Sequence, residues 1–227
     1  MMLREGYYCV VFISVFAGAV TVTVGGLAAW VLWVLVPMAG YLFRLTRRAV
    51  PPSPLAVVCP IDGVVDRTWQ TRTPDGKQTV AAIRIKSLGF GELAIRAPTE
   101  GKVVKEWFLD SGELPRDLRK QGAEESAKLL YIIDEDLQCR RYRAWIQTDE
   151  KDNVITSVAG SLLRPHWYVR AGERVGQGQL AGMFWFSAAV TVMVPGNCRI
   201  RVQPGAKVRS GSDILANLVR KPAESAA

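Results

Sequence analysis

The chain has 227 residues, four cysteines, one histidine and a formal net charge of +8. The cysteines form no CxxC pair, which together with the single histidine excludes a metal site of the usual Cys/His type. No nucleic-acid-binding motif occurs, so we do not expect nucleic acid as a partner. The positive charge favours an anionic membrane surface instead.

The first predicted element is an apolar block, Tyr7–Phe43, that contains no charged side chain. A single helix of this length would measure about 55 Å, whereas the hydrocarbon core of a bilayer is about 30 Å thick. Because Gly25-Gly26 interrupts the block near its middle, we expect a transmembrane helical hairpin with arms Tyr7–Val24 and Leu27–Phe43. One long tilted helix is the alternative.

Positive charges flank this block on both sides. Arg4 precedes it, and Arg44, Arg47 and Arg48 follow it. Since positive residues favour the cytoplasmic side, both ends of the hairpin should lie there. The scattered single cysteines are also typical of a reducing compartment. The sequence therefore predicts a protein of the cell (inner) membrane with its soluble domain in the cytoplasm.

The composition divides the chain into four parts. Residues 1–48 form the predicted anchor, and residues 49–54 form a stiff spacer that contains Pro51-Pro52-Ser53-Pro54. Residues 55–220 form the predicted soluble domain, and residues 221–227 a polar, alanine-rich tail that we expect to be disordered. An oligomer is compatible with this organisation.

The soluble domain is predicted to be mostly β, within the α+β class. Its short apolar runs are rich in β-branched and aromatic residues and are bounded by turn residues. One stretch, Pro115–Ala127, has a helical pattern. The predicted strands are Leu55–Cys59, Val64–Trp69, Thr79–Ile85, Lys102–Phe108, Leu129–Ile133, Cys139–Thr148, Val154–Val158, Gly182–Phe186, Val190–Val194 and Cys198–Val202.

A weak internal repeat indicates how these strands pack. Pro60-Ile-Asp-Gly-Val-Val resembles Pro98-Thr-Glu-Gly-Lys-Val-Val, and Val169-Arg-Ala-Gly-Glu-Arg-Val-Gly-Gln-Gly resembles Val202-Gln-Pro-Gly-Ala-Lys-Val-Arg-Ser-Gly. Repeated strands joined by glycine turns are typical of a β-sandwich of two small sheets, similar to the barrel-sandwich of lipoyl and biotinyl carriers. A carrier or scaffold is therefore one hypothesis, although a carrier needs a modifiable Lys at a hairpin tip and neither repeat has an obvious one.

Several motifs occur in a fixed order along nearly the whole chain, and they resemble the short, membrane-anchored bacterial form of phosphatidylserine decarboxylase. They are Leu3-Arg-Glu-Gly-Tyr, Tyr41-Leu-Phe-Arg, Cys59-Pro-Ile-Asp-Gly-Val-Val, Arg96-Ala-Pro, Gly101-Lys-Val, Ala171-Gly-Glu-Arg-Val-Gly, Gly182-Met-Phe-Trp-Phe-Ser-Ala-Ala-Val-Thr-Val-Met-Val-Pro and Ser210-Gly-Ser-Asp-Ile-Leu-Ala.

The resemblance implies a lyase of phospholipid biosynthesis that is made as an inactive zymogen. In this family a serine near the C-terminus attacks the preceding carbonyl, the chain breaks, and the serine becomes a pyruvoyl group. The pyruvoyl carbonyl binds the amine of phosphatidylserine and accepts electrons while CO₂ leaves, which yields phosphatidylethanolamine. The implied partners are a phospholipid membrane and phosphatidylserine or a related anionic lipid.

The family's catalytic residues map only partly onto this chain. Asp62 matches an aspartate that assists self-cleavage in the family. Ala188 sits at the family serine position, so a pyruvoyl group could come only from Ser187, one residue earlier. A shift of one residue on a strand sends a side chain to the opposite face, unless a bulge restores the register.

Other family positions also differ or carry two interpretations. Leu93 lies nearest the place of the family histidine, and the chain's only histidine, His166, is far along the sequence. Arg96 and Arg164 are candidate substrate-binding residues, because arginine binds phosphate and carboxylate in bidentate geometry. Two further hypotheses follow: an active pyruvoyl-dependent decarboxylase with Asp62 and Ser187 as catalytic residues, and a catalytically inactive lipid-binding homologue.

Overall fold

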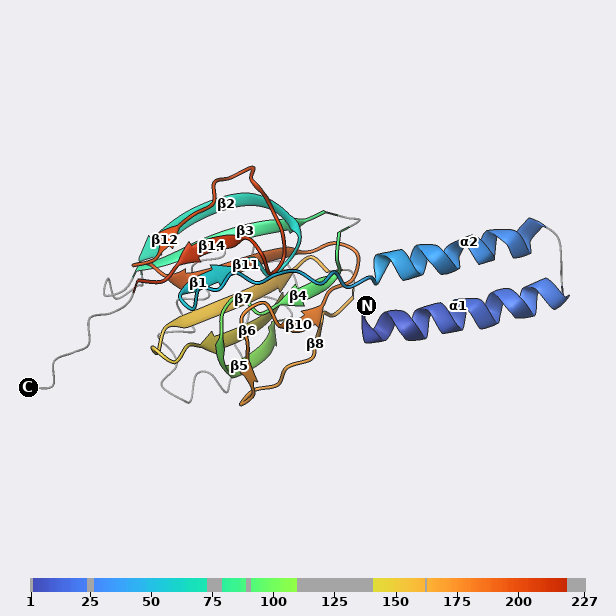
Figure 1. Cartoon of the computed structure of the whole chain (residues 1–227), viewed down its shortest axis with the longest axis horizontal. Helices are drawn as coiled ribbons and strands as arrows, with labels where there is room; N and C mark the ends of the chain where they lie inside the picture. The colour runs from blue at the N-terminus through green and yellow to red at the C-terminus, as the bar shows by residue number, and fades with distance from the viewer. Residues whose placement is uncertain are drawn as a thin grey trace, which may run out of the picture.

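The computed structural model describes residues 2–23, 27–72, 79–88, 91–109, 141–161 and 163–219. Two helices come first and a strand-rich domain follows, which confirms the predicted mostly β fold behind a helical hairpin (Figure 1). The predicted helix Pro115–Ala127, the predicted strand Leu129–Ile133 and the predicted tail 221–227 lie outside the described residues.

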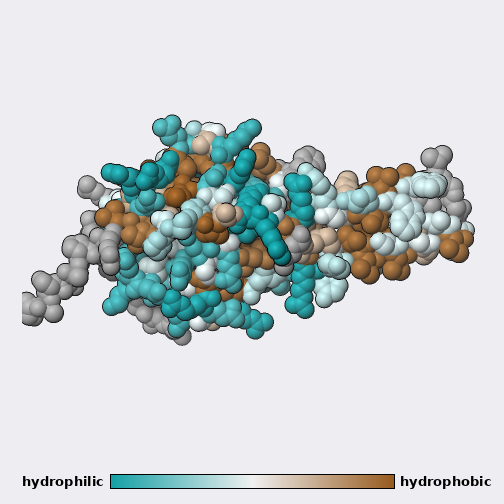
Figure 2. Space-filling view, in the orientation of Figure 1, coloured by the Kyte–Doolittle hydropathy of each residue, from teal (hydrophilic) through white to brown (hydrophobic). Residues whose placement is uncertain are grey.

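The hairpin consists of α1 (Arg4–Thr23) and α2 (Leu27–Leu42), which run side by side away from the domain (Figure 1). With 20 residues, α1 is about 30 Å long, and it is apolar enough to cross a bilayer. Apolar side chains such as Phe12, Val15 and Trp30 are exposed on the hairpin, and Figure 2 shows brown, apolar surface along it. The alternative of one long helix is therefore wrong.

The base of the hairpin is closed against itself. The Leu3 amide donates to the Phe43 carbonyl at 2.9 Å, and Met2 and Arg44 form an isolated antiparallel bridge. Gly6 lies directly against the Phe43 ring, where a larger residue would overlap it. Both ends of the anchor therefore reach the domain at the same place.

Three antiparallel sheets form the described part of the domain. The largest has eight strands in the order β13-β2-β3-β11-β7-β6-β5-β9, and two three-stranded sheets have the orders β1-β14-β12 and β4-β10-β8. The bounds are β1 (Ala56–Val58), β2 (Gly63–Arg72), β3 (Thr79–Ser87), β4 (Ala94–Arg96), β5 (Gly101–Leu109), β6 (Arg141–Gln147), β7 (Asn153–Ala159), β8 (His166–Trp167), β9 (Arg174–Val175), β10 (Leu180–Met183), β11 (Ala189–Pro195), β12 (Arg199–Ile200), β13 (Lys207–Val208) and β14 (Ile214–Asn217).

One predicted strand, Gly182–Phe186, is displaced. β10 ends at Met183, and the chain then turns before β11 begins at Ala189. Within this turn Phe186 adopts a left-handed backbone conformation with φ of 64°. A residue with this backbone cannot continue a strand, so the turn separates what the sequence pattern joined.

The internal repeat corresponds to matching structural units. Gly178 donates its amide to Ala97 O at 2.9 Å, and Gly211, 33 positions further on, donates to Cys59 O at 2.8 Å. Both glycines have positive φ, 70° and 74°, which a side chain would strain. The repeats thus form two similar turns that face each other, as expected for a barrel-sandwich.

The two repeats also exchange backbone hydrogen bonds where they cross. Val58 N donates to Pro98 O at 2.7 Å, and Arg96 N donates to Pro60 O at 2.9 Å. These reciprocal bonds bring the loop after β1 and the loop after β4 together. The loop after β1 carries Asp62, so this crossing positions the candidate site.

Candidate functional site

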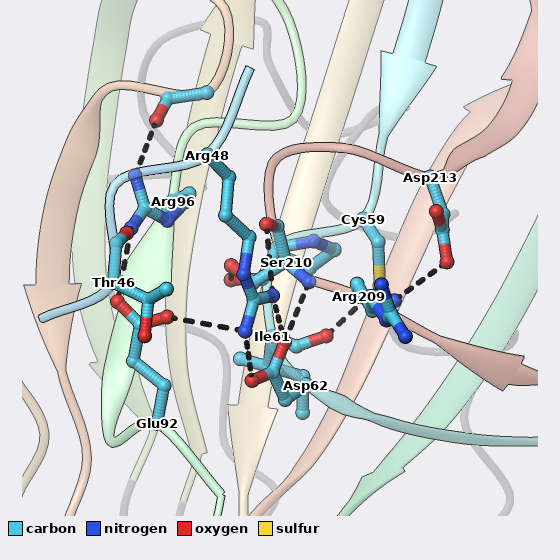
Figure 3. Close-up of polar contacts among 12 residues, drawn as sticks. Thr46, Arg48, Cys59, Ile61, Asp62, Glu92, Arg96, Arg209, Ser210 and Asp213 are labelled. Atoms are coloured by element: carbon cyan, nitrogen blue, oxygen red, sulfur yellow. Dashed lines mark hydrogen bonds and ion pairs between the residues drawn. The ribbon is translucent and has the colours of Figure 1, made fainter. Parts of the chain in front are cut away.

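The Asp62 side chain accepts three hydrogen bonds. It lies in the loop between β1 and β2 and is half-buried. Both of its carboxylate oxygens accept hydrogen bonds from the Arg48 guanidinium; the Nη2–Oδ2 distance is 2.7 Å. The Ser210 amide donates to Oδ1 at 2.7 Å (Figure 3).

The ionisation of Asp62 follows from these contacts. Burial alone would raise the pKa of its carboxyl, but the hydrogen bonds from Arg48 and from the Ser210 amide outweigh burial and lower it. Asp62 is therefore a carboxylate at neutral pH. For the same reason, the Asp62 carboxylate raises the pKa of Arg48.

A second ion pair lies beside the first (Figure 3). Arg96 donates from Nη2 to Glu92 Oε1 at 2.9 Å and to the Thr46 carbonyl at 2.7 Å. The other oxygen of Glu92 lies 3.7 Å from Arg48 Nη2, so the two ion pairs are linked. We call the connected residues the Arg48–Asp62 cluster: Thr46, Arg48, Asp62, Glu92, Arg96 and Ser210.

The cluster is enclosed by protein. Glu92 and Ser210 are 2% and 0% exposed, and the Ser210 hydroxyl donates to Pro60 O at 2.9 Å. Burial raises the pKa of Glu92, although Arg96 acts in the opposite direction. Charges in such a position are retained when they are paired, because an unpaired buried charge costs several kcal/mol.

The cluster ties the membrane anchor to the domain. Thr46 and Arg48 follow α2, whereas the groups that they contact belong to the domain. Further along the same segment, Val50 packs against Gly178. The segment after α2 is therefore docked on the domain surface.

Asp62 is held as an ion-pair acceptor. A general base needs an accessible lone pair within about 3 Å of the proton that it removes. Both oxygens of Asp62 already accept hydrogen bonds from Arg48, and one of them also accepts from Ser210. In this conformation the Asp62 carboxylate is the acceptor of the ion pair with Arg48.

The structure does not bring Ser187 and Asp62 into contact. Ser187 lies in the turn between β10 and β11, is exposed, and donates its amide to Trp185 O at 2.9 Å. Within the described part of the chain, neither Ser187 nor Asp62 makes a hydrogen bond to the other.

Ala188, by contrast, faces inward. It is 4% exposed, its amide donates to Ser87 Oγ at 3.0 Å, and its carbonyl accepts from the Ser87 amide at 2.9 Å. Ser87 is in turn paired with Gly63, the residue after Asp62. Ala188, Ser87 and Gly63 thus lie in one row across the sheet. Two strand spacings, about 10 Å, separate Ala188 from Gly63.

The family histidine position is occupied by a buried leucine. Leu93 is 4% exposed, and its carbonyl accepts the Phe184 amide at 3.0 Å. His166 lies instead at the base of the hairpin, with Nε2 3.9 Å from Glu5 Oε1 and its ring against Tyr168. No titratable side chain therefore replaces the histidine at position 93.

The two candidate substrate-binding arginines have different environments. Arg96 is 9% exposed, and its Nη atoms are used by Glu92, Thr46 and Gly178. Arg164 is exposed, and its guanidinium lies 4.9 Å from the centre of the Phe108 ring. Only Arg164 of this pair presents its charge to the surroundings.

Sequence reasoning missed four members of the cluster: Thr46, Arg48, Glu92 and Ser210. Arg48 was interpreted only as a topology signal, because nothing in a run of basic residues after an apolar block indicates which one is buried. Glu92 carries no local motif, and the motif that begins at Ser210 does not indicate which groups the Ser210 amide and hydroxyl contact.

The chain is similar to known proteins over nearly its whole length. A profile of the family described as phosphatidylserine decarboxylase matches residues 94–216. A "phosphatidylserine decarboxylase proenzyme" of Burkholderia mallei (strain SAVP1) is 30% identical over 224 residues, which is 98% of this chain and 97% of the relative. A relative of the same name in Burkholderia ambifaria (strain MC40-6) is 29% identical over 96% of both chains. No solved structure matches the chain significantly. This chain belongs to the phosphatidylserine decarboxylase family.

Proposed function

We propose that this protein is a membrane-anchored, phosphatidylserine-binding member of its family that works in phospholipid metabolism without cleaving itself. The observation that carries the proposal is the pair of side chains at positions 187 and 188. Ala188 has no hydroxyl and is buried, whereas Ser187 is exposed and makes no hydrogen bond to Asp62. The family's lipid substrate and the apolar hairpin support the membrane and lipid part of the proposal.

The second candidate is an active phosphatidylserine decarboxylase. The names of the Burkholderia relatives favour it, because "proenzyme" implies processing of the chain. The retained Asp62 favours it as well. In that case Ser187 is the source of the pyruvoyl group, and a rearrangement of the β10–β11 turn has to bring its hydroxyl to the Phe186 carbonyl.

Intact-mass spectrometry of the purified full-length protein separates the two candidates. We expect one species near 25.0 kDa. Two fragments that result from a break between Phe186 and Ser187, with a blocked N-terminus on the smaller one, would instead establish the pyruvoyl route. A Ser187→Ala variant is the matched control, because it removes the remaining hydroxyl of this turn and must abolish any such cleavage.

Arg164 is the proposed contact for the lipid head group. Its guanidinium is exposed and is oriented by the Phe108 ring, so it can pair with a carboxylate or phosphate at little further ordering cost. Arg96 has the proposed role of holding Glu92 and the segment after α2 in place.

Arg164→Gln should weaken binding of a soluble short-chain phosphatidylserine about tenfold, since a charge-assisted hydrogen bond contributes about 1.5 kcal/mol. Binding to the full-length protein can be measured by thermophoresis, with short-chain phosphatidylcholine as the reference ligand. Arg199→Gln is the control, because Arg199 is exposed on β12 at the end of the domain away from the hairpin (Figure 1). Equal losses in both variants would argue against a specific contact.

We also propose that the domain lies on the cytoplasmic side of the membrane. The arginines at both ends of the hairpin, Arg4 at the start of α1 and Arg44 and Arg47 after α2, support this orientation.

A further inference from the structure

Three large apolar side chains are exposed on loops of the β domain. Leu88 is 48% exposed, Leu163 is 54% exposed and Phe186 is 56% exposed. We call these three residues the apolar tip. Each lies outside the strands, so the alternation of buried and exposed residues along a strand does not explain its exposure.

Backbone and side-chain hydrogen bonds bring the three loops together. Ser87, next to Leu88, exchanges two hydrogen bonds with Ala188. Ser161, two positions before Leu163, accepts the Trp185 amide at 2.9 Å with its hydroxyl oxygen. Since Trp185 and Ala188 flank Phe186, the loops that carry Leu88 and Leu163 both attach to the loop that carries Phe186.

The tip lies beside the base of the hairpin. The Trp185 ring contacts the Phe43 ring edge-to-face, with 5.7 Å between the ring centroids. Phe43 directly follows α2, and the end of β3 and the start of β11 lie on the side of the domain that faces the hairpin in Figure 1. The tip is therefore at the level where the anchor enters the domain.

Phe186 is held in an unfavourable conformation. Its φ of 64° is in the left-handed region, which is rare for a bulky residue and strained. The hydrogen bond from Ser187 N to Trp185 O closes the turn around it. Because Phe186 is 56% exposed, its packing against the described part of the chain is incomplete, which leaves much of the strained side chain free for a contact outside it.

We propose that the apolar tip inserts into the interface of the same bilayer that the hairpin spans, as a second membrane contact of this protein. Phe and Leu are side chains that partition into this region, and the exposed Arg44 and Arg47, which follow α2 at the base of the hairpin, fit anionic head groups. This inference rests on the proposed membrane anchorage. It adds that the Phe186 turn, and hence the family's processing segment, is held against lipid.

The test uses the full-length protein in nanodiscs that contain a phospholipid with a photoactivatable carbene group in its acyl chain near the glycerol. After irradiation, mass spectrometry maps the labelled residues. We expect label on the hairpin and on Leu88, Leu163 and Phe186. Val219 is the internal control and should carry none; it is 50% exposed and follows β14, which ends on the side of the domain away from the hairpin (Figure 1).

Label on the hairpin without label on the tip would overturn the inference and leave the anchorage intact. No label on either would refute the anchorage itself. A second variant, Phe186→Gly, removes the aromatic ring and also the strain, so it should melt no lower than the wild type. It should reduce labelling of Leu88 and Leu163, whereas Val219→Gly should not. Unchanged labelling in Phe186→Gly would remove Phe186 from the proposed contact.

Discussion

Replacing Arg48 by methionine should lower the free energy of unfolding of the domain by about 3 kcal/mol, because it leaves two buried carboxylates without their shared cation. Asp62 would lose both hydrogen bonds from Arg48, and Glu92 would lose its nearest charge apart from Arg96. For a domain of this size the fall in melting temperature should be roughly 6–12 °C, measured by the intrinsic tryptophan fluorescence of the detergent-solubilised protein.

Arg47→Met is the matched control for this prediction. Arg47 has the same charge one position earlier, but it is exposed. We expect its substitution to change the free energy of unfolding by less than about 0.5 kcal/mol. Similar destabilisation by both variants would mean that net charge, and not the ion pair with Asp62, accounts for the effect.

The same ion pair has a defined pH dependence. The pKa of Asp62 is lowered in the folded protein, so its contribution to stability is present above the pKa of the unfolded chain, about 3.9, and is lost as the pH falls through the folded value. The difference in melting temperature between wild type and Asp62→Asn should therefore be largest near neutral pH and shrink below about pH 4. A constant difference would contradict an ionised Asp62.

Gly63→Ala and Gly101→Ala should each destabilise the domain by about 3 kcal/mol through overpacking. A methyl group at Gly63 would overlap the Lys86 carbonyl oxygen on β3, and one at Gly101 would overlap the Gln147 carbonyl oxygen on β6. Because both obstacles are backbone atoms of a paired strand, neither can move without breaking the sheet. Thermal unfolding of the two variants measures the effect.

Gly176→Ala provides the comparison. An added methyl group there would meet only the end of the Gln179 side chain, at 3.6 Å. We expect its melting temperature to stay within about 2 °C of the wild type, since the contact is an ordinary one. If Gly63→Ala were equally mild, the close approach of β2 and β3 at this point would be refuted.

The parts of the fold that were predictable from the sequence are those with a long, regular pattern. The uncharged block Tyr7–Phe43 predicted the hairpin, because its length exceeds a single span. Long strands such as β2, β3 and β11 were predicted because five or more residues with strand-forming side chains follow one another. β4, β8, β9, β13 and β14 were not predicted, since strands of two to four residues are too short to show a period.

The candidate site was less predictable, because its contacts join distant parts of the chain. Asp62 stood out through its motif, but its partners Arg48 and Ser210 lie 14 and 148 positions away. The position of Ser187 is set by the left-handed backbone conformation of Phe186. No residue type in Phe-Trp-Phe-Ser-Ala predicts this conformation. Tertiary contacts decide such a turn.

Strands that follow the Phe186 turn in the chain share sheets with strands that precede it. β11 lies between β3 and β7, and β14 lies between β1 and β12. A protein nicked at this turn would therefore keep its elution volume, its circular dichroism and its cooperative melting, because the short C-terminal piece supplies interior strands and cannot dissociate without global unfolding. The fraction of cleaved molecules must therefore be measured after the chain has been fully denatured.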